Sequence, residues 1–177
     1  MSILIEAVCL VIPRKNLDAQ YPGGAERFLR HSTARLSAEH RHVCMDDNLI
    51  ALSYFSPDAT DRAIVPLVQA GMIETEDDEF ADFAIVDQRY GPTLPCSWLS
   101  WSRDSSGLTS AWLTGALPGE LSTPEGWTLE SSLKLKRIDI RNFPDRALKL
   151  ADENGIETWL DFQTGQITTR LANNARY

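Results

Sequence analysis

The chain has 177 residues, a formal net charge of −8, 43% hydrophobic residues and 24% charged residues. This composition excludes an intrinsically disordered chain, and the negative charge disfavours binding of nucleic acid through the overall field of the protein. No run of 18 apolar residues is present, which excludes a transmembrane helix and predicts a protein with no membrane contact.

The first element is an apolar run over residues 3–12, interrupted by Glu6. Such a run predicts a strand that is covered on at least one face and has strands on both sides. No basic segment precedes it, and Pro13, Arg14 and Lys15 follow it where a signal peptide would carry a cleavage site of small residues. We therefore expect a cytoplasmic protein whose first strand spans residues 3–12.

The next elements complete an alternating order. Residues 24–31 show helical spacing of apolar side chains, and residues 41–45 and 49–55 are predicted strands. Ser56, Pro57 and Asp58 form a helix start, and Gly71 marks the end of that helix. A fourth strand is predicted at residues 80–86. The order β-α-β-β-α-β over residues 3–87 predicts an α+β fold of the ferredoxin-like type, with strands 3–12 and 49–55 in the centre of the sheet.

The second half of the chain is richer in predicted strands. We expect a strand at residues 108–114, a loop at 117–126, one or two strands at 127–140, a helix at 144–154, a hairpin of strands 158–162 and 167–171, and a frayed tail at 173–177. The predicted organisation is a ferredoxin-like unit over residues 1–101 and a β-rich α+β unit over 102–177. The second unit either packs on the first or extends its sheet within one continuous domain.

The densest group of reactive side chains lies between residues 86 and 101, where a strand runs into a loop stiffened by two prolines. Edge-strand ends and the loops that leave them often carry sites. Arg89 suits a bidentate grip on a carboxylate or a phosphate. Cys96 would need a lowered pKa to act as a nucleophile. The candidate binding residues are Asp87, Arg89, Tyr90, Thr93, Cys96 and Trp98.

For the same segment, the sequence favours a structural role over a binding or catalytic role. In that interpretation the prolines stiffen a corner between the halves, Arg89 pairs with a carboxylate such as Asp87, and the tryptophans are buried against the first sheet. Cys96 is the weak catalytic candidate, since no protease or hydrolase signature surrounds it.

Three other groups of polar residues are candidates for a site. The carboxylates at 74, 76–79 and 82 lack the spacing of an EF-hand, so we interpret them as a solvated loop. The basic side chains between Lys134 and Lys149 are interpreted as a solvated face. His40, His42 and Cys44 alternate along a predicted strand, but no zinc motif accompanies them. We therefore expect no metal site and no cofactor.

The function that the sequence favours is a non-enzymatic binding protein, because an acidic surface is combined with no catalytic signature. The expected partner is a basic protein, which this chain would neutralise or regulate, or a second copy of the chain. One alternative is a small-molecule sensor with a pocket between the halves. Another is a small thiol enzyme that uses Cys96. A Cys96→Ser variant separates these readings, because a binding protein keeps its activity and a thiol enzyme loses it.

Overall fold

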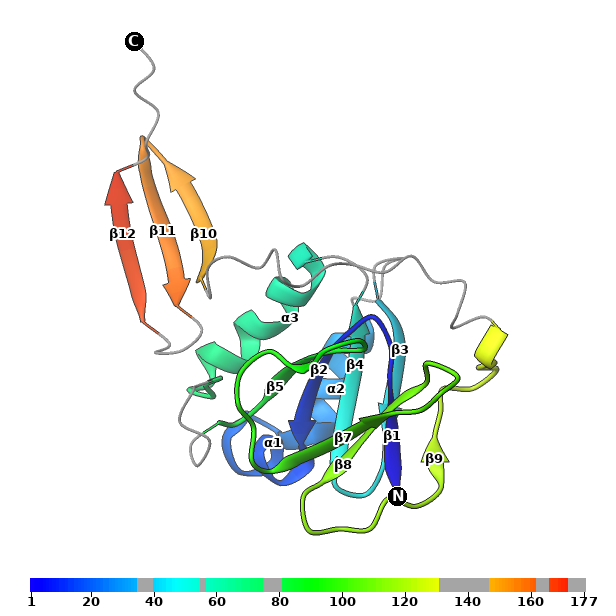
Figure 1. Cartoon of the computed structure of the whole chain (residues 1–177). Helices are drawn as coiled ribbons and strands as arrows, with labels where there is room; N and C mark the ends of the chain where they lie inside the picture. The colour runs from blue at the N-terminus through cyan, green and yellow to red at the C-terminus, as the bar shows by residue number, and fades with distance from the viewer. Residues whose placement is uncertain (35–39, 55–56, 75–80, 131–146, 162–165, 172–177) are drawn as a thin grey trace.

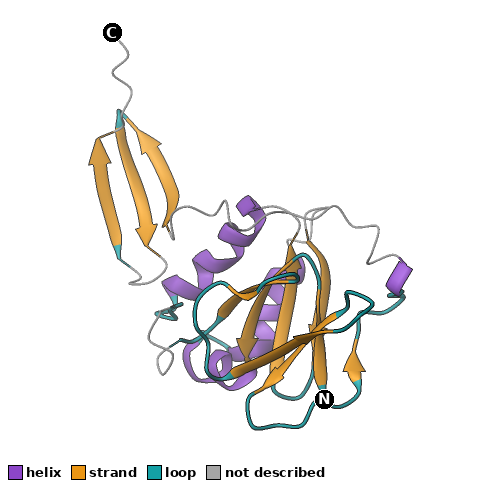
Figure 2. Cartoon of the chain, in the orientation of Figure 1, coloured by secondary structure: helices purple, strands orange, loops and turns teal. Residues whose placement is uncertain are grey.

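The computed structural model describes residues 1–34, 40–54, 57–74, 81–130, 147–161 and 166–171. Within these ranges it is a mixed α+β structure with three helices and three sheets (Figures 1 and 2). The helices are α1 (Arg14–Gln20), α2 (Gly24–Ala34) and α3 (Pro57–Gln69). The strands are β1 (Ser2–Ile5), β2 (Val8–Pro13), β3 (His40–Met45), β4 (Leu49–Tyr54), β5 (Ala84–Asp87), β6 (Gly91–Pro92), β7 (Leu99–Arg103), β8 (Thr109–Leu113), β9 (Leu121–Ser122), β10 (Ala147–Glu153), β11 (Ile156–Asp161) and β12 (Ile167–Leu171). No described helix is long and apolar enough to cross a membrane.

A five-stranded sheet forms the middle layer of the main body. Its strand order is β3-β4-β2-β5-β6, and all neighbouring strands are antiparallel. A four-stranded sheet of order β7-β8-β1-β9 lies on one face of it, and the helices lie on the other (Figure 1). The third sheet, β10-β11-β12, projects from the body beside α3 in Figure 1.

The alternation of side chains along β2 explains why its sequence is apolar throughout. Val8, Leu10 and Ile12 belong to a core cluster shared with the three helices, whereas Cys9 and Val11 belong to a cluster shared with the second sheet. Both faces of the strand are therefore buried, and every residue of β2 and β4 is buried.

The expectation of one strand over residues 3–12 is wrong, because the chain changes sheets at Glu6 and Ala7. Ala7 has a φ of 52°, a left-handed conformation that L residues other than glycine rarely adopt. Gln88 stabilises this break on both sides: its side-chain Oε1 accepts a hydrogen bond from Ala7 N at 3.2 Å, and its backbone N donates to Ala7 O at 2.9 Å. The sequence does not show this break, because β1 and β2 are both buried and are therefore both apolar.

The expected helix at residues 144–154 is also wrong where the chain is described, since residues 147–153 form β10. The Asn154-Gly155 pair that follows has positive φ at both residues, 53° and 76°, and it joins β10 to β11 in an antiparallel hairpin. Asn-Gly is the preferred sequence for this tight turn. The strong helix propensity of alanine, leucine and lysine obscured that signal.

Smaller differences concern the ends of elements. The expected loop at 117–126 contains the short strand β9, which pairs in parallel with β1. The helix α1 was not anticipated, because Leu17 is its single buried residue. The helix α3 continues past Pro66 to Gln69. The strands expected at 127–140 are absent from residues 127–130, and the rest of that range, like the tail at 173–177, lies outside the described residues.

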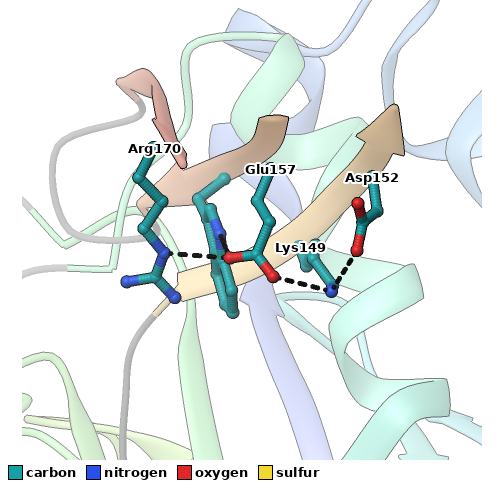
Figure 3. Close-up of polar contacts among 5 residues, drawn as sticks. Lys149, Asp152, Glu157 and Arg170 are labelled. Atoms are coloured by element: carbon teal, nitrogen blue, oxygen red, sulfur yellow. Dashed lines mark hydrogen bonds and ion pairs between the residues drawn. The ribbon is translucent and has the colours of Figure 1, made fainter. Parts of the chain in front are cut away.

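A polar network covers one face of the third sheet (Figure 3). The Glu157 carboxylate on β11 accepts hydrogen bonds from Lys149 Nζ at 3.0 Å, Trp159 Nε1 at 3.0 Å and Arg170 Nε at 3.2 Å. Lys149 also pairs with Asp152 at 3.0 Å, and the Arg170 guanidinium lies 3.8 Å from the centre of the Trp159 ring. Side chains from all three strands therefore meet at Glu157.

This network predicts an acid-dependent loosening of the third sheet. The hydrogen bonds from Lys149, Trp159 and Arg170 lower the pKa of Glu157 below its ordinary value of 4.5. The stabilisation is therefore present above that value and is lost as the pH falls through the lowered native pKa. Amide exchange followed by NMR between pH 6 and pH 2 is expected to show opening of β10–β12 in the acid range.

The Glu157→Gln variant is expected to open the sheet already at pH 7 and to lose the acid dependence. Glu153→Gln removes an exposed carboxylate from the same sheet and serves as the control. An unchanged acid profile in Glu157→Gln would show that another group governs the loosening.

Candidate functional site

Residues 86–101 form a corner that is folded back on β5. The strand ends at Asp87, the chain turns, and β6 pairs with the strand it has just left, with Val86 opposite Pro92 and Asp87 opposite Gly91. Thr93 N then donates to Ile85 O at 2.9 Å. The segment leads into β7, the edge strand of the second sheet. The corner thus connects the five-stranded sheet to the four-stranded one.

Asp87 and Arg89 form an ion pair inside this corner. The Asp87 residue is 1% exposed, and its Oδ1 accepts a hydrogen bond from Arg89 N at 2.7 Å and lies 3.6 Å from Arg89 Nε. Its other oxygen, Oδ2, is buried with no hydrogen-bond partner among the described residues. The charge of Asp87 is therefore compensated mainly by Arg89.

Thr93 and Trp98 turn inward and tie the loop to the body. Thr93 Oγ1 donates to Glu74 Oε1 at 3.1 Å, and Trp98 Nε1 donates to Ala81 O at 3.0 Å. Tyr90 differs from these two, because it is 48% exposed and its ring lies 5.1 Å from the Arg89 guanidinium carbon. Of the candidate residues, Tyr90 is the one that presents a large surface to solvent.

The acidic segment is only partly the solvated loop that the sequence suggests. Glu74 is 2% exposed, and its Oε1 accepts from Ile85 N at 3.1 Å as well as from Thr93. Asp82 Oδ2 accepts from Ile73 N at 3.0 Å, and its Oδ1 accepts from Gln20. Glu74 therefore contacts β5, and Asp82 contacts α1 and the segment that follows α3, which corrects their interpretation as solvated. Residues 76–79 lie outside the described part of the chain.

Histidines and metal ligands do not assemble in the described residues. His40 and His42 lie on β3, but a register shift between them breaks the expected alternation with Cys44. No group of three or more histidine, cysteine, aspartate or glutamate side chains that could hold a metal ion occurs where the chain is described. The expected basic face between residues 134 and 146 falls outside the described ranges.

Cys96 is the most accessible thiol of the three cysteines. It is half-buried and packs against the core between the two sheets, while Cys9 and Cys44 are buried. His31 lies on α2, on the opposite face of the five-stranded sheet, so it is not a partner for this thiol. Burial raises the pKa of Cys9 to about 12 and also raises the pKa of Cys44, which keeps both as neutral thiols.

We expect a thiol reagent at pH 8 to modify Cys96 first in the native protein. The thiolate is the reactive form, and Cys9 and Cys44 become thiolates only after local or global opening. Mass spectrometry of the labelled peptides measures the order of reaction. Cys96→Ser is expected to abolish the fast phase, and a fast phase that survives this substitution would refute the assignment.

Two buried features escaped the sequence analysis. Glu6, 1% exposed, accepts a hydrogen bond at its Oε1 from Trp127 Nε1 at 2.7 Å. Gly91, with a φ of 81°, lies directly beneath the Trp101 ring: a Cβ at this position would be 2.3 Å from Trp101 Cε2. The lone acid in an apolar run was a usable signal for the first. Nothing local in the sequence indicates the second.

Exposed apolar and acidic side chains occur on the two segments that contain the end of β3 and the start of β9, and these segments are in contact. Ser122 Oγ on β9 donates to Met45 O on β3 at 2.7 Å. Met45 is 48% exposed, and Leu117, in the loop before β9, is 87% exposed, the highest value for a large apolar residue in the described chain. The exposed acids Asp47 and Glu120 flank these side chains in sequence. We call these four residues the Met45–Leu117 surface.

The two segments that build this surface contain no lysine or arginine. Residues 43–50 contribute Asp46 and Asp47, and residues 113–126 contribute Glu120 and Glu125. Ser2 N donates to Glu120 O at 3.1 Å, and β1 pairs with β9, so the second segment is fixed to the body. The result is an edge with exposed apolar side chains, on segments whose charged side chains are all carboxylates.

Comparison with known proteins gives no relationship: no protein-family model, curated protein or solved structure matches the chain.

Proposed function

We propose that the chain is a non-enzymatic binding protein that holds a basic protein on its Met45–Leu117 surface. The single observation that carries this proposal is the exposure of Leu117, 87%, and of Met45, 48%, on segments whose only full charges are negative. Exposed apolar side chains within a polar rim are typical of protein interfaces.

The charge of this surface supports a cationic partner. Carboxylates near an interface steer an oppositely charged protein during its approach and repel acidic proteins. Met45 and Leu117 would then supply the apolar contact that is buried on binding. The net charge of −8 acts in the same direction over longer distances.

The contacts within residues 86–101 support a structural role for that segment. Asp87, Thr93 and Trp98 make hydrogen bonds to the protein itself, and Cys96 packs against the core. Side chains used in this way have little left to offer a ligand. We assign the segment to the corner between the sheets, with Tyr90 as its exposed exception.

We further assign residues 8–87 to a ferredoxin-like unit. The support is the antiparallel order β3-β4-β2-β5, which places the first and third strands of this unit in the centre, together with one face covered by helices. A ferredoxin-like unit hosts many functions and adds none by itself. We further propose a reducing compartment, the cytoplasm, because Cys9 and Cys44 are buried as thiols that form no disulfide among the described residues.

The test begins with a photoreactive amino acid in place of Leu117, used to capture the partner in the source cell. The partner identified by mass spectrometry is then purified, and its affinity for the unmodified chain is measured at several salt concentrations. We expect a basic partner whose binding weakens as salt rises. We also expect Asp47→Asn with Glu120→Gln to weaken binding about tenfold or more, through a lower association rate.

The matched control is Glu26→Gln with Glu153→Gln, which removes the same charge from α2 and β10. It is expected to change affinity by less than about threefold, because these side chains lie outside the surface. An acidic partner, or an equal loss of affinity in both double variants, would contradict the proposal.

A further inference from the structure

The two faces of the third sheet differ in chemistry. Glu157 and Trp159 alternate along β11 with Ile156 and Leu160. The first pair lies in the polar network of Figure 3. On the other face Leu160 is 2% exposed and joins the core cluster of the helices, while Ile156 and Ile167 are 47% and 59% exposed. The apolar face is therefore buried at one point and open to solvent elsewhere.

The two edges of this sheet also differ. β10 carries Lys149, Asp152 and Glu153 and has a register irregularity after Lys149. Charges and bulges of this kind prevent unwanted strand pairing. β12 reads Ile-Thr-Thr-Arg-Leu, has no proline or glycine, and carries three β-branched residues. Among the described residues no strand pairs with its outer side, and Thr168, Thr169 and Arg170 are exposed.

The one charge on β12 is already engaged within the chain. Arg170 Nε donates to Glu157 Oε2 at 3.2 Å, and its guanidinium stacks on Trp159 at 3.8 Å. This pairing holds the arginine over the polar face and offsets its charge. Arg170 therefore does little to prevent β12 from pairing with a strand of another chain, which an exposed edge charge normally prevents.

We propose that β12 pairs antiparallel with β12 of a second copy of this chain, about a two-fold axis at Thr169. In this register Thr169 faces the second copy's Thr169, Thr168 faces the second copy's Arg170, and Ile167 faces the second copy's Leu171. Apolar residues meet apolar residues and no like charges are opposed, so the strand is complementary to itself. This surface is separate from the Met45–Leu117 surface, and its use does not depend on the proposed function.

The same register accounts for the exposed isoleucines. Within one copy Leu160 is opposite Ile167, and Ile156 is opposite Leu171. Pairing at β12 extends these rows across the axis, so that Leu160 and Ile167 continue into the second copy's Leu171 and Ile156. The two open apolar faces become one continuous face of a six-stranded sheet.

The favoured partner is a second copy because the fit is symmetric. An unrelated strand would need a matching sequence, whereas β12 supplies its own match. Five residue pairs make a small interface, so the dimer is weak, with a dissociation constant of about 10 to 500 µM. Both copies carry the same negative charge, so added salt is expected to strengthen the association.

Sedimentation velocity of the full chain from about 5 µM to 1 mM tests the proposal. We expect a monomer that converts to a dimer over this range. Thr169→Lys and Thr169→Glu each place like charges on the axis, and each is expected to weaken dimerisation about tenfold or more. An equimolar mixture of the two variants is expected to restore association, because unlike charges then face each other.

Leu150→Lys on β10 adds a charge to the other edge of the sheet and is the control, with dimerisation expected to stay within about twofold of the unaltered chain. Circular dichroism verifies that each variant is folded. A chain that remains monomeric at 1 mM, single variants that still dimerise, or a mixture that fails to associate would each overturn the proposal.

Discussion

Gly91→Ala is expected to lower the free energy of unfolding by about 3 kcal/mol. Gly91 adopts a φ of 81°, which is strained for any residue with a Cβ, and the added methyl would lie 2.3 Å from Trp101 Cε2 and 2.4 Å from Cζ2. The tryptophan ring is rigid, so it must move as a unit or β6 must shift. The urea midpoint of the variant measures the loss.

Two further variants separate the strain of the backbone from the clash. Gly115 has a φ of 88°, and no atom of the described residues lies within 4 Å of an added Cβ, so Gly115→Ala reports the backbone strain alone, about 1 kcal/mol. Trp101→Ala in the Gly91→Ala background removes the obstructing ring. We expect Gly91→Ala to be about as mild there as Gly115→Ala. If Gly91→Ala and Gly115→Ala lowered the free energy of unfolding equally, the Trp101 ring would move aside at no measurable cost.

Arg89→Ala is expected to destabilise the protein by about 3 kcal/mol, because it leaves the buried Asp87 carboxylate without its cation. Asp87 is 1% exposed, and among the described residues it keeps only the hydrogen bond from the backbone N of residue 89, at 2.7 Å. Adding Asp87→Asn removes the charge that caused the loss, so the double variant is expected to recover most of it.

The control for this pair is Arg103→Ala. Arg103 is exposed and contacts Gly107 O at 3.4 Å, so its loss is expected to cost less than about 0.5 kcal/mol. If Arg89→Ala were as stable as Arg103→Ala, the structural role proposed for the corner would be refuted. Arg89 would then return as a candidate for ligand binding.

Local patterns were enough to predict two strands of the five-stranded sheet and the helix that follows them. The strands expected at 41–45 and 49–55 are observed as β3 and β4, and the helix expected to follow Ser56 begins at Pro57. In each case the signal is local: the residues that indicate the strand or the start of the helix are close to one another in the sequence. The break at Ala7 could not be predicted, because it depends on Gln88, which is remote in sequence and contacts Ala7 only in the folded chain.

The candidate site also combines local contacts, which the sequence predicts, with long-range contacts, which it does not. The Asp87–Arg89 pair spans two positions in the sequence and was anticipated. The inward turn of Thr93 depends on Glu74, and that of Trp98 depends on the backbone of Ala81. The Met45–Leu117 surface joins two segments that are remote in sequence and meet through the hydrogen bond from Ser122 Oγ on β9 to Met45 O on β3. Long-range contacts of this kind carry no local signature, so sequence reasoning placed the binding residues on the corner.

Hydrogen–deuterium exchange of the chain, with and without its isolated partner, tests the proposed binding surface most directly. Residues 43–50 and 113–126 are expected to gain protection in the complex, while residues 86–101 exchange at the same rate in both states. Protection confined to residues 86–101, with none at 43–50 and 113–126, would contradict the account.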